Sequence, residues 1–258
     1  MIVGKDGWLF YGSPTDGTTI ECYTGNVLFS DEELERMVRN LTYTRDRLAE
    51  QGIEFVVFIA PNKERAYSEY MPDYYGEQAE ECMLTQALSY LREHTDIRIV
   101  YPYEELMAYK KAHPQQEVYY KTDTHWNEIG GYIGAKALLK ELGIDIPPLE
   151  QYEITAVGDS IGDLAGTLNV VGFTEKGFFT DIKRKAGADP RQAAEKKILM
   201  RRDSFGAAMA PYLADNLSGV ELRHYTEFKP EQIWEQKPDV FVIQIVERYV
   251  RWLRNENL

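Results

Sequence analysis

The sequence predicts an α/β protein in which a mostly parallel sheet lies between two layers of helices. Residues Ile53–Ala60 are apolar except for Glu54, and the continuous run Phe55–Ala60 is typical of a strand buried on both faces. Other short apolar runs alternate along the chain with segments whose apolar residues recur at helical spacing. The 258 residues, of which 44% are hydrophobic, are enough to bury a substantial core.

The first predicted elements follow a glycine-rich start. Loops or short hairpins are indicated in the first 30 residues by Gly4, Gly7, Gly12, Gly17 and Gly25. A capping box at Ser30–Glu33 then begins a helix whose apolar face consists of Leu34, Met37, Val38, Leu41 and Leu48. The strand Ile53–Ala60 stops at Pro61. A second helix over about Glu77–Glu93 precedes a short strand at Ile97–Val100.

The second half of the chain continues the alternation. A helical pattern over Trp126–Leu142 ends at Gly143, whereas residues 151–190 have no clean period and are expected to form an elaborated loop region. The remaining elements are predicted to be strands at Lys197–Arg201, Val220–Tyr225 and Val240–Ile245, a helix from about Phe205, and a helix over Glu247–Asn255. No linker divides the chain, so residues 1–258 are predicted to form one domain.

The charge of the chain makes several function classes improbable. With 42 acidic and 29 basic residues the net charge is -13, which repels nucleic-acid phosphates and anionic lipids. No apolar run is long enough to cross a bilayer, and no signal peptide is visible at the start. Cys22 and Cys82 lie in no CxxC pair, which disfavours a zinc site. They are expected to be unrelated thiols, with a single disulfide as the alternative.

Ser204 lies where a predicted strand runs into a predicted helix. The strand Lys197–Arg201 leads directly to Asp203 and Ser204. Substrates of α/β proteins bind at the carboxyl ends of strands, and the N–H groups that begin a helix can stabilise an oxyanion. The alternative is that Ser204 or Asp203 only caps the helix, which is the common role of such residues. Ser204 alone does not decide between the two interpretations.

Asp123 and His125 form an Asp-x-His pair in a predicted loop. The carboxylate can accept the Nδ1–H of the imidazole and leave Nε2 free to act as a base. The alternative is a helix cap beside a histidine that is merely hydrogen-bonded. The pair together with Ser204 on one α/β sheet favours nucleophilic chemistry over the capping interpretations.

Five short motifs, in this order, resemble those of a known family. They are Gly4-Lys5-Asp6-Gly7-Trp8-Leu9-Phe10-Tyr11, Pro61-Asn62-Lys63, Thr122-Asp123-Thr124-His125-Trp126-Asn127, Gly162-Asp163-Leu164-Ala165 and Asp203-Ser204-Phe205. The set resembles the SGNH-hydrolase-like family of the alginate O-acetyltransferases AlgX and AlgJ and the bacterial DHHW proteins. The resemblance implies a flavodoxin-like three-layer sandwich with a circularly permuted order of motifs. It also implies a catalytic triad in which Ser204 is the nucleophile, His125 the base and Asp123 the orienting carboxylate.

The sequence departs from the family pattern near the expected nucleophile. Arg202 stands where the family often has glycine, and the usual Gly-x-Asn is absent after Val240–Ile245. Gly158-Asp159-Ser160 spells the familiar string, but it adjoins a separate motif, so Ser160 is not expected to be the nucleophile. The oxyanion hole is then assigned only to the backbone N–H of Ser204, with Arg248 or Tyr249 as further candidates. Glu247 and Arg248 are expected to form a structural salt bridge.

Several other residues are candidates for contact with substrate. Asn62 and Lys63 follow the buried strand, and Lys63 is alternatively expected to hold a neighbouring carboxylate. Trp8 and Trp126 are candidates for stacking on a sugar ring, with burial in the core as the default. A local basic patch would require Arg201, Arg202 and Lys63 to lie together.

The resemblance implies O-acetylation of an exported or cell-surface polysaccharide through an acetyl-serine intermediate. A carbohydrate acetylesterase with the same triad is one alternative, and a non-catalytic cell-envelope protein that keeps the fold is the other. The resemblance implies no cofactor and no metal, an acetyl donor delivered by a membrane acyltransferase, and a location outside the cytoplasm. The acidic chain is better suited to a neutral or amino-sugar glycan than to a polyanion.

Overall fold

A five-stranded parallel sheet forms the centre of the protein. The computed structural model describes residues 1–13, 19–167, 174–188 and 192–258. In spatial order the strands are β4 (Arg98–Val100), β3 (Glu54–Ala60), β9 (Val240–Val246), β7 (Ala194–Arg202) and β8 (Leu217–His224). Every pair of neighbours in this sheet is parallel, which confirms the predicted α/β class.

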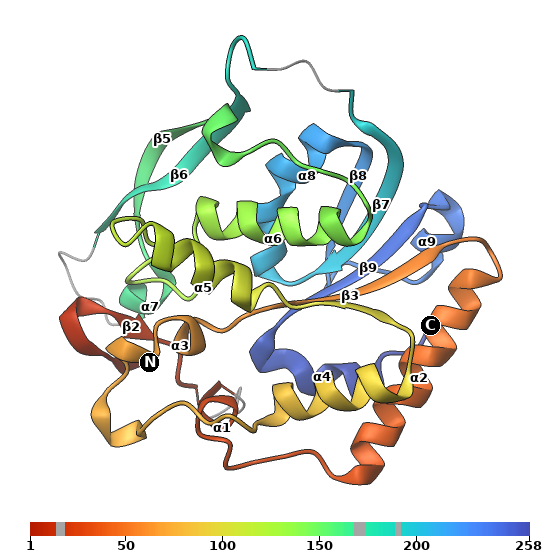
Figure 1. Ribbon diagram of the computed structural model, residues 1–258, viewed down its shortest axis with the longest axis horizontal. Helices are drawn as coiled ribbons and strands as arrows, with labels where there is room; N and C mark the ends of the chain where they lie inside the picture. Colours follow the sequence, from red (N-terminus) through yellow and green to blue (C-terminus); the bar gives the residue numbers. More distant parts are fainter. Residues whose placement is uncertain (14–18, 168–173, 189–191) are drawn as a thin grey trace.

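Helices cover both faces of the sheet, as Figure 1 shows. One layer contains α2 (Asp31–Ala49), α4 (Met83–His94), α9 (Glu231–Gln236) and the 3-10 helix η6 (Glu247–Asn255). The opposite layer contains α5 (Tyr103–Ala112), α6 (Glu128–Glu141) and α8 (Ala210–Asn216). In β3, Val56 and Phe58 point into the second layer and Val57 and Ile59 into the first. Burial on both faces explains why this strand is apolar at every position after Glu54.

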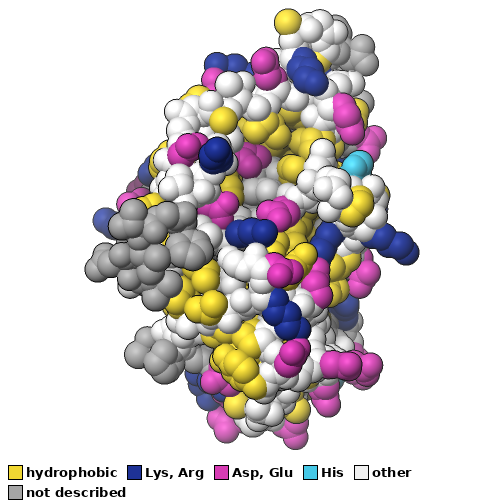
Figure 2. Space-filling view, turned by 90° about the vertical axis from the view of Figure 1, so that its left-hand side faces the viewer, with side chains coloured by type: hydrophobic (Ala, Val, Ile, Leu, Met, Phe, Trp, Pro, Cys, Tyr) yellow, Lys and Arg dark blue, Asp and Glu magenta, His cyan; other side chains and the backbone are white. Residues whose placement is uncertain are grey.

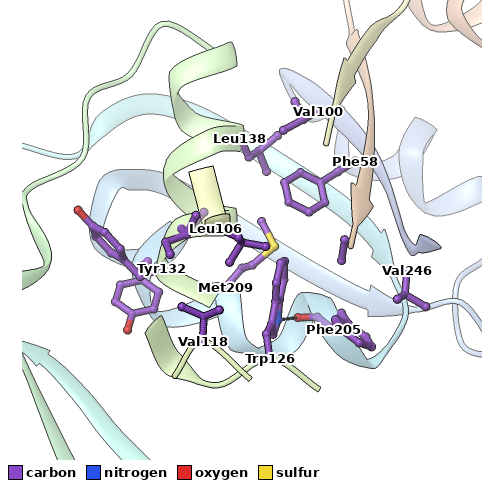
Figure 3. Packing of buried hydrophobic residues seen from close by; sticks show 14 of the residues in the cluster. Phe58, Val100, Leu106, Val118, Trp126, Tyr132, Leu138, Phe205, Met209 and Val246 are labelled. Atoms are coloured by element: carbon purple, nitrogen blue, oxygen red, sulfur yellow. Dashed lines mark hydrogen bonds between the residues drawn. The ribbon is translucent and has the colours of Figure 1, made fainter. Parts of the chain in front are cut away.

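The core on the α6 side directly supports the carboxyl edge of the sheet. Phe58 of β3 and Leu138 of α6 pack together in it, and the ring of Trp126 lies across Phe205 (Figure 3). The indole N–H of Trp126 donates to the carbonyl oxygen of Phe205 at 2.9 Å. This bond ties the loop that precedes α6 to the turn that follows β7.

Because the five strands are parallel, the segments that follow them meet at one edge. The helix α3 (Lys63–Ala66) follows β3, the 3-10 helix η5 (Ser204–Met209) follows β7, and η6 follows β9. The loop before α6 reaches the same edge, where Tyr119 and Trp126 form an isolated antiparallel bridge. Residues far apart in the sequence therefore meet on this side of the molecule.

The segment expected to be a loop at residues 151–190 contains instead a two-stranded antiparallel hairpin. Its strands are β5 (Tyr152–Ile161) and β6 (Thr174–Arg184), with the short helix α7 (Asp163–Gly166) between them. The prediction was wrong because the two strands bury only one residue, Tyr152, and their register shifts twice. Apolar residues such as Val157 and Phe179 therefore stay exposed and give no regular alternation.

Other differences from the predicted elements are local. The second predicted helix begins at Met83 rather than Glu77, and α6 begins at Glu128 because Asn127 caps it. The capping box at Ser30 is confirmed, whereas the last predicted helix is of the 3-10 type. The helices that were not anticipated are α1 (Thr19–Thr24), α5, and the short helices α3, α7 and α9.

The glycine-rich start forms a small hairpin of β1 (Ile2–Val3) and β2 (Leu9–Phe10), with the 3-10 helix η1 (Lys5–Gly7) between them. Gly17 and the other residues of 14–18 lie outside the described part, as do residues 168–173 and 189–191. The remaining 3-10 helices are η2 (Ser68–Tyr70), η3 (Asp73–Tyr75) and η4 (Leu149–Gln151). In the described residues no helix is both long enough and apolar enough to cross a membrane.

Candidate active site

Ser204 and His125 face each other at the carboxyl edge of the sheet. Ser204 is exposed at the first position of η5, immediately after β7. Its Oγ lies 2.6 Å from Nε2 of His125, although the two residues are 79 positions apart in the sequence. The ring of His125 also packs against Phe205 at 4.8 Å between centroids. This places an imidazole nitrogen within hydrogen-bond reach of an accessible hydroxyl.

Asp203, not Ser204, fixes the turn. One oxygen of Asp203 accepts the backbone N–H of Phe205 at 2.9 Å and the Nε2–H of Gln244 at 2.9 Å. The other oxygen accepts the backbone N–H of Val246 on the neighbouring strand β9. Burial raises the pKa of Asp203 although these donors oppose the shift. Because Asp203 supplies the cap, the Ser204 hydroxyl is available for other contacts.

Asp123 orients the imidazole ring from the far side. Its Oδ1 lies 2.6 Å from Nδ1 of His125 and also accepts that residue's backbone N–H at 2.9 Å. Its Oδ2 accepts the backbone N–H of Asp163 at 2.7 Å. Burial alone would raise the pKa of Asp123, but the contacts with His125 and the N–H of Asp163 lower it below its usual value. The charged form of Asp123 is thereby favoured.

A second carboxylate, Asp163, supports this loop. Its side chain accepts the backbone N–H of Thr124 at 2.8 Å and the Thr124 hydroxyl at 2.6 Å. One of its oxygens lies 3.8 Å from Nδ1 of His125. Sequence reasoning assigned Asp163 to a motif but gave it no role. A Cβ on Gly162 would lie 2.3 Å from the carbonyl oxygen of Thr122, so the close approach of the two segments requires glycine.

The carboxylates of Asp123 and Asp163 and the imidazole of His125 also resemble a set of metal ligands, because their donor atoms lie within 4.8 Å of one another. The three are already joined through hydrogen bonds that involve Nδ1 and all four carboxylate oxygens. A cation here would have to displace these bonds. The arrangement therefore favours orientation of the imidazole over metal binding.

Lys63 lies beneath the site as a buried support. Its ammonium group donates to the carbonyl oxygens of Leu9, Lys121 and Asp123 at 2.6, 2.8 and 2.9 Å. The expectation that it holds a carboxylate is wrong, and at 2% exposure it offers no surface to substrate. Burial lowers the pKa of Lys63 to about 8 although nearby carboxylates oppose the shift.

The predicted salt bridge between Glu247 and Arg248 is also wrong. Glu247 pairs instead with Arg65 at 2.8 Å, and it accepts the backbone N–H of Asn62 at 3.0 Å. The Asn62 side chain accepts the backbone N–H of Arg248 at 3.2 Å. The guanidinium of Arg248 lies over the ring of Phe205 at 5.4 Å. All four polar residues are buried, so they form the floor of the site.

The remaining basic candidates do not form a patch. Arg201 makes two hydrogen bonds of 2.5 Å with Glu256. Arg202 donates to the carbonyl oxygen of Asp203 at 3.0 Å, and its stem packs on Gly206. Because Lys63 is buried, the three cations proposed from the sequence act separately. The arginine that replaces the family glycine therefore lies beside the turn.

The aromatic candidates and the cysteines are mainly structural. Trp126 is buried, and Trp8 is buried in a stack with Tyr67 at 4.1 Å between centroids. Tyr249 stacks on Trp252 at 3.9 Å. Cys22 and Cys82 are both buried free thiols, and Arg65 donates to the carbonyl oxygen of Cys22 at 3.3 Å and to Sγ of Cys82 at 3.0 Å.

Ser160 lies on the hairpin, where its hydroxyl donates to the carbonyl oxygen of Ile161 at 3.3 Å. His125 therefore has Ser204 as its partner, and the familiar Gly158-Asp159-Ser160 string lies elsewhere.

A pocket of about 500 Å³ opens over the Ser204–His125 pair. Figure 2 views the molecule from this side, where hydrophobic side chains gather around a hollow in the upper half. The hairpin supplies one wall through Phe178, Phe179, Thr180 and Ile182, and the segment around α6 supplies Tyr120 and Glu128. Sequence reasoning missed these residues because it placed the hairpin in a loop.

The fold and the Ser–His–Asp arrangement are those of an SGNH-hydrolase-like protein. Residues 1–211 match the family model described as SGNH hydrolase-like domain, acetyltransferase AlgX, so the chain belongs to that family. It is 24% identical over 141 residues to a probable alginate O-acetylase AlgJ of Pseudomonas putida, which covers 54% of this chain and 32% of that protein. The chain thus spans about a third of the length of this relative.

Solved structures confirm the predicted fold. PatB1 of Bacillus cereus, in a structure with a sulfonyl adduct, superposes with a TM-score of 0.66 at 16% identity, covering 100% of both chains. A DHHW family protein from Eubacterium siraeum superposes with a TM-score of 0.59 at 16% identity, covering 90% of this chain and 91% of that one. The predicted resemblance named AlgJ and the DHHW proteins, and this chain is similar to a member of each.

Proposed function

We propose that the protein transfers an acetyl group to a hydroxyl of a polysaccharide through an acetyl-Ser204 intermediate. The observation that carries this proposal is the hydrogen-bonded series Ser204–His125–Asp123, with contacts of 2.6 Å on both sides of the imidazole. Membership in an acetyltransferase family supports the choice of acetyl as the group transferred.

In the first half-reaction His125 Nε2 takes the proton of Ser204, and Oγ attacks the carbonyl carbon of the acetyl donor. Asp123 accepts the Nδ1–H, which keeps Nε2 available and stabilises the imidazolium that forms. When the tetrahedral intermediate collapses, the bond to the donor's leaving group breaks and His125 returns the proton to that group. Acetyl-Ser204 remains.

In the second half-reaction a sugar hydroxyl gives its proton to His125 and attacks the acetyl carbonyl. The acetyl ester of the sugar forms, and Ser204 regains its proton from the imidazolium. The backbone N–H of Ser204 is our candidate donor to the oxyanion in both steps. Asn62, Lys63 and Arg248 are assigned to the support of the site because they are buried.

Hydrolysis of a carbohydrate acetyl ester is the second candidate function. It uses the same three residues, and the exposure of Ser204 favours it because water reaches the acetyl-enzyme as readily as a sugar does. The third interpretation, a non-catalytic envelope protein, is less well supported because Ser204, His125 and Asp123 are within hydrogen-bond reach of one another and Arg202 does not come between them.

The place of action and the acetyl donor belong to the same proposal. The AlgJ relative is named for alginate, a polysaccharide, which supports action outside the cytoplasm on an exported glycan. A membrane acyltransferase that delivers the acetyl group would supply the donor. An assay with an artificial acetyl donor cannot identify the natural donor. That donor is identified by reconstituting the protein with candidate membrane acyltransferases.

The experiment is turnover of p-nitrophenyl acetate by the wild type and by Ser204→Ala, with intact mass measured after acid quenching. We expect the wild type to gain one acetyl group and Ser204→Ala to gain none. Ser160→Ala is the matched control, since it removes the same hydroxyl from the hairpin. Equal background rates in all three proteins would refute the proposal, and oligosaccharides added to the reaction separate transfer from hydrolysis.

A further inference from the structure

The pocket over Ser204 combines aromatic rings with carboxylates. Tyr120 stacks on Phe178 with 4.7 Å between centroids, and Phe179 stands against Phe178 at 5.3 Å. Phe179 is 53% exposed, so its ring is accessible to a ligand in the pocket. The C–H faces of pyranose rings pack well on such exposed rings. This wall is therefore suited to a sugar chain.

The charged groups of the pocket are negative. Glu128 lies at the start of α6, and one of its oxygens accepts the Tyr120 hydroxyl at 2.7 Å, so the carboxylate is held at the aromatic wall. Asp123 lies at the base. Just beyond the lining, Glu175 accepts the backbone N–H and the hydroxyl of Thr122 at 2.5 and 2.8 Å. Asp163 adds a fourth carboxylate beside His125.

No lysine or arginine is among the described residues that line the pocket. Of the cations close to the site, Lys63 is buried on three carbonyl oxygens, Arg202 donates to the carbonyl oxygen of Asp203, and the buried guanidinium of Arg248 lies over Phe205. On the hairpin, Lys176 and Lys183 occupy exposed positions of β6, and Lys183 pairs with Asp181. A carboxylate on every ring of an acceptor would thus meet carboxylates without a compensating cation.

We infer that the acceptor is a glycan of uncharged or amino sugars, not a polyuronate, and that Glu128 is the charge that selects it. The inference rests on the proposed acetyl transfer. The inferred acceptor differs from alginate, the polysaccharide in the name of the AlgJ relative, because alginate is a polyuronate. An ammonium group on the acceptor would find a counter-charge at Glu128, and an uncharged ring would need only the aromatic wall.

The test uses three acceptors with the same β-1,4-linked hexameric backbone, built from glucose, glucosamine or mannuronate. With p-nitrophenyl acetate as donor, we expect kcat/KM for the mannuronate hexamer to be about tenfold or more below that for the other two. The difference should shrink at high salt, because salt screens charges on an open pocket. Equal or better acetylation of mannuronate would overturn the inference while leaving acetyl transfer intact. Failure to form an acetyl-enzyme from the donor would overturn both the proposed acetyl transfer and the inferred choice of acceptor.

Glu128→Gln tests the assigned residue. The amide keeps an acceptor for the Tyr120 hydroxyl but removes the charge, so we expect the preference for glucosamine over mannuronate to fall several-fold. Glu235→Gln removes a carboxylate from the exposed surface of α9 and is the matched control. An unchanged preference in Glu128→Gln would overturn its role as the selecting charge.

Discussion

The central sheet and the β5–β6 hairpin both contribute to one pocket, yet they differ in how they are held. Every residue of β9 is buried, and so is every residue of β3 after the first. In the hairpin, β5 has one buried residue, Tyr152, and β6 has none. The sheet is fixed by packing on both faces, whereas the hairpin is fixed mainly by its own backbone pairing.

This difference suggests a division of roles. Below the proposed nucleophile, Asp203 and Lys63 each bind several buried backbone groups, so neither side chain can change without leaving those groups unsatisfied. On the hairpin, Phe178 and Phe179 line the pocket, and neither side chain is fully buried. We therefore expect changes near the sheet to affect chemistry or stability, and changes on the hairpin to affect the choice of acceptor.

The largest effect is expected at His125, in the loop that precedes α6. His125→Ala removes the proposed base, and acetyl-enzyme formation should fall by about 10⁴-fold. The fold should persist because His125 is partly exposed, so the urea midpoint should stay close to that of the wild type. Stopped-flow release of p-nitrophenol measures the rate. A loss of less than tenfold would contradict the assignment of His125 as base.

A change in the floor of the site should act on stability. Lys63→Met leaves three buried carbonyl oxygens without their donor, and the free energy of unfolding should fall by about 3 kcal/mol. Urea denaturation measures it. Lys229→Met changes an exposed lysine and is the control, for which we expect a change within about 0.5 kcal/mol.

The cost of Lys63→Met should also depend on pH. The pKa of Lys63 falls from 10.5 to about 8 on burial, so between these values the unfolded chain binds more protons at this residue than the folded chain. Its contribution to stability therefore rises with pH across that window and is lost as pH falls towards 8. The difference in unfolding free energy between wild type and Lys63→Met should grow accordingly. A constant difference would argue against the lowered pKa.

A smaller effect is expected at Asp163, which positions the loop of Asp123 and His125. Asp163→Asn keeps the backbone N–H to Asp123 but weakens the two bonds to Thr124, and kcat should fall about tenfold. KM for the acceptor should be unchanged, because the loss concerns the imidazole and not the sugar. A matching rise in KM would indicate that Asp163 contacts substrate.

The hairpin should respond in the opposite way. Phe178→Ala removes the ring stacked on Tyr120, so KM for a hexameric acceptor should rise several-fold while acetyl-enzyme formation persists. Its half-buried position limits the cost in stability to about 1 kcal/mol. Initial rates over a range of acceptor concentrations measure KM. A larger loss of stability than of acceptor affinity would break the proposed division of roles.

The smallest effect is expected at Ser160, in the string that looks most like a nucleophile motif. Ser160→Ala removes one hydrogen bond to the neighbouring carbonyl oxygen, so stability should change by no more than about 0.5 kcal/mol. Acetyl-enzyme formation should equal that of the wild type. Loss of the acetyl adduct in this variant would assign the nucleophile to the hairpin instead of the sheet.

The sequence by itself determined features that depend on neighbouring residues. The apolar run Phe55–Ala60, the capping box at Ser30 and the Asp-x-His pair each involve groups a few positions apart, so their geometry follows from local backbone structure. The position of Ser204 at a strand end also followed from a local change of pattern. These features were sufficient to predict the fold class and to single out Asp123, His125 and Ser204, whereas their roles in a triad were implied by the family resemblance.

The tertiary structure alone decided what depends on distant partners. It placed His125 against Ser204 across 79 positions, paired Glu247 with Arg65 across 182, and turned Lys63 from a candidate ligand into a buried support. It also formed the hairpin wall that sequence periodicity could not show. The local sequence does not specify which distant group a polar side chain will contact, because packing of the whole core selects that partner.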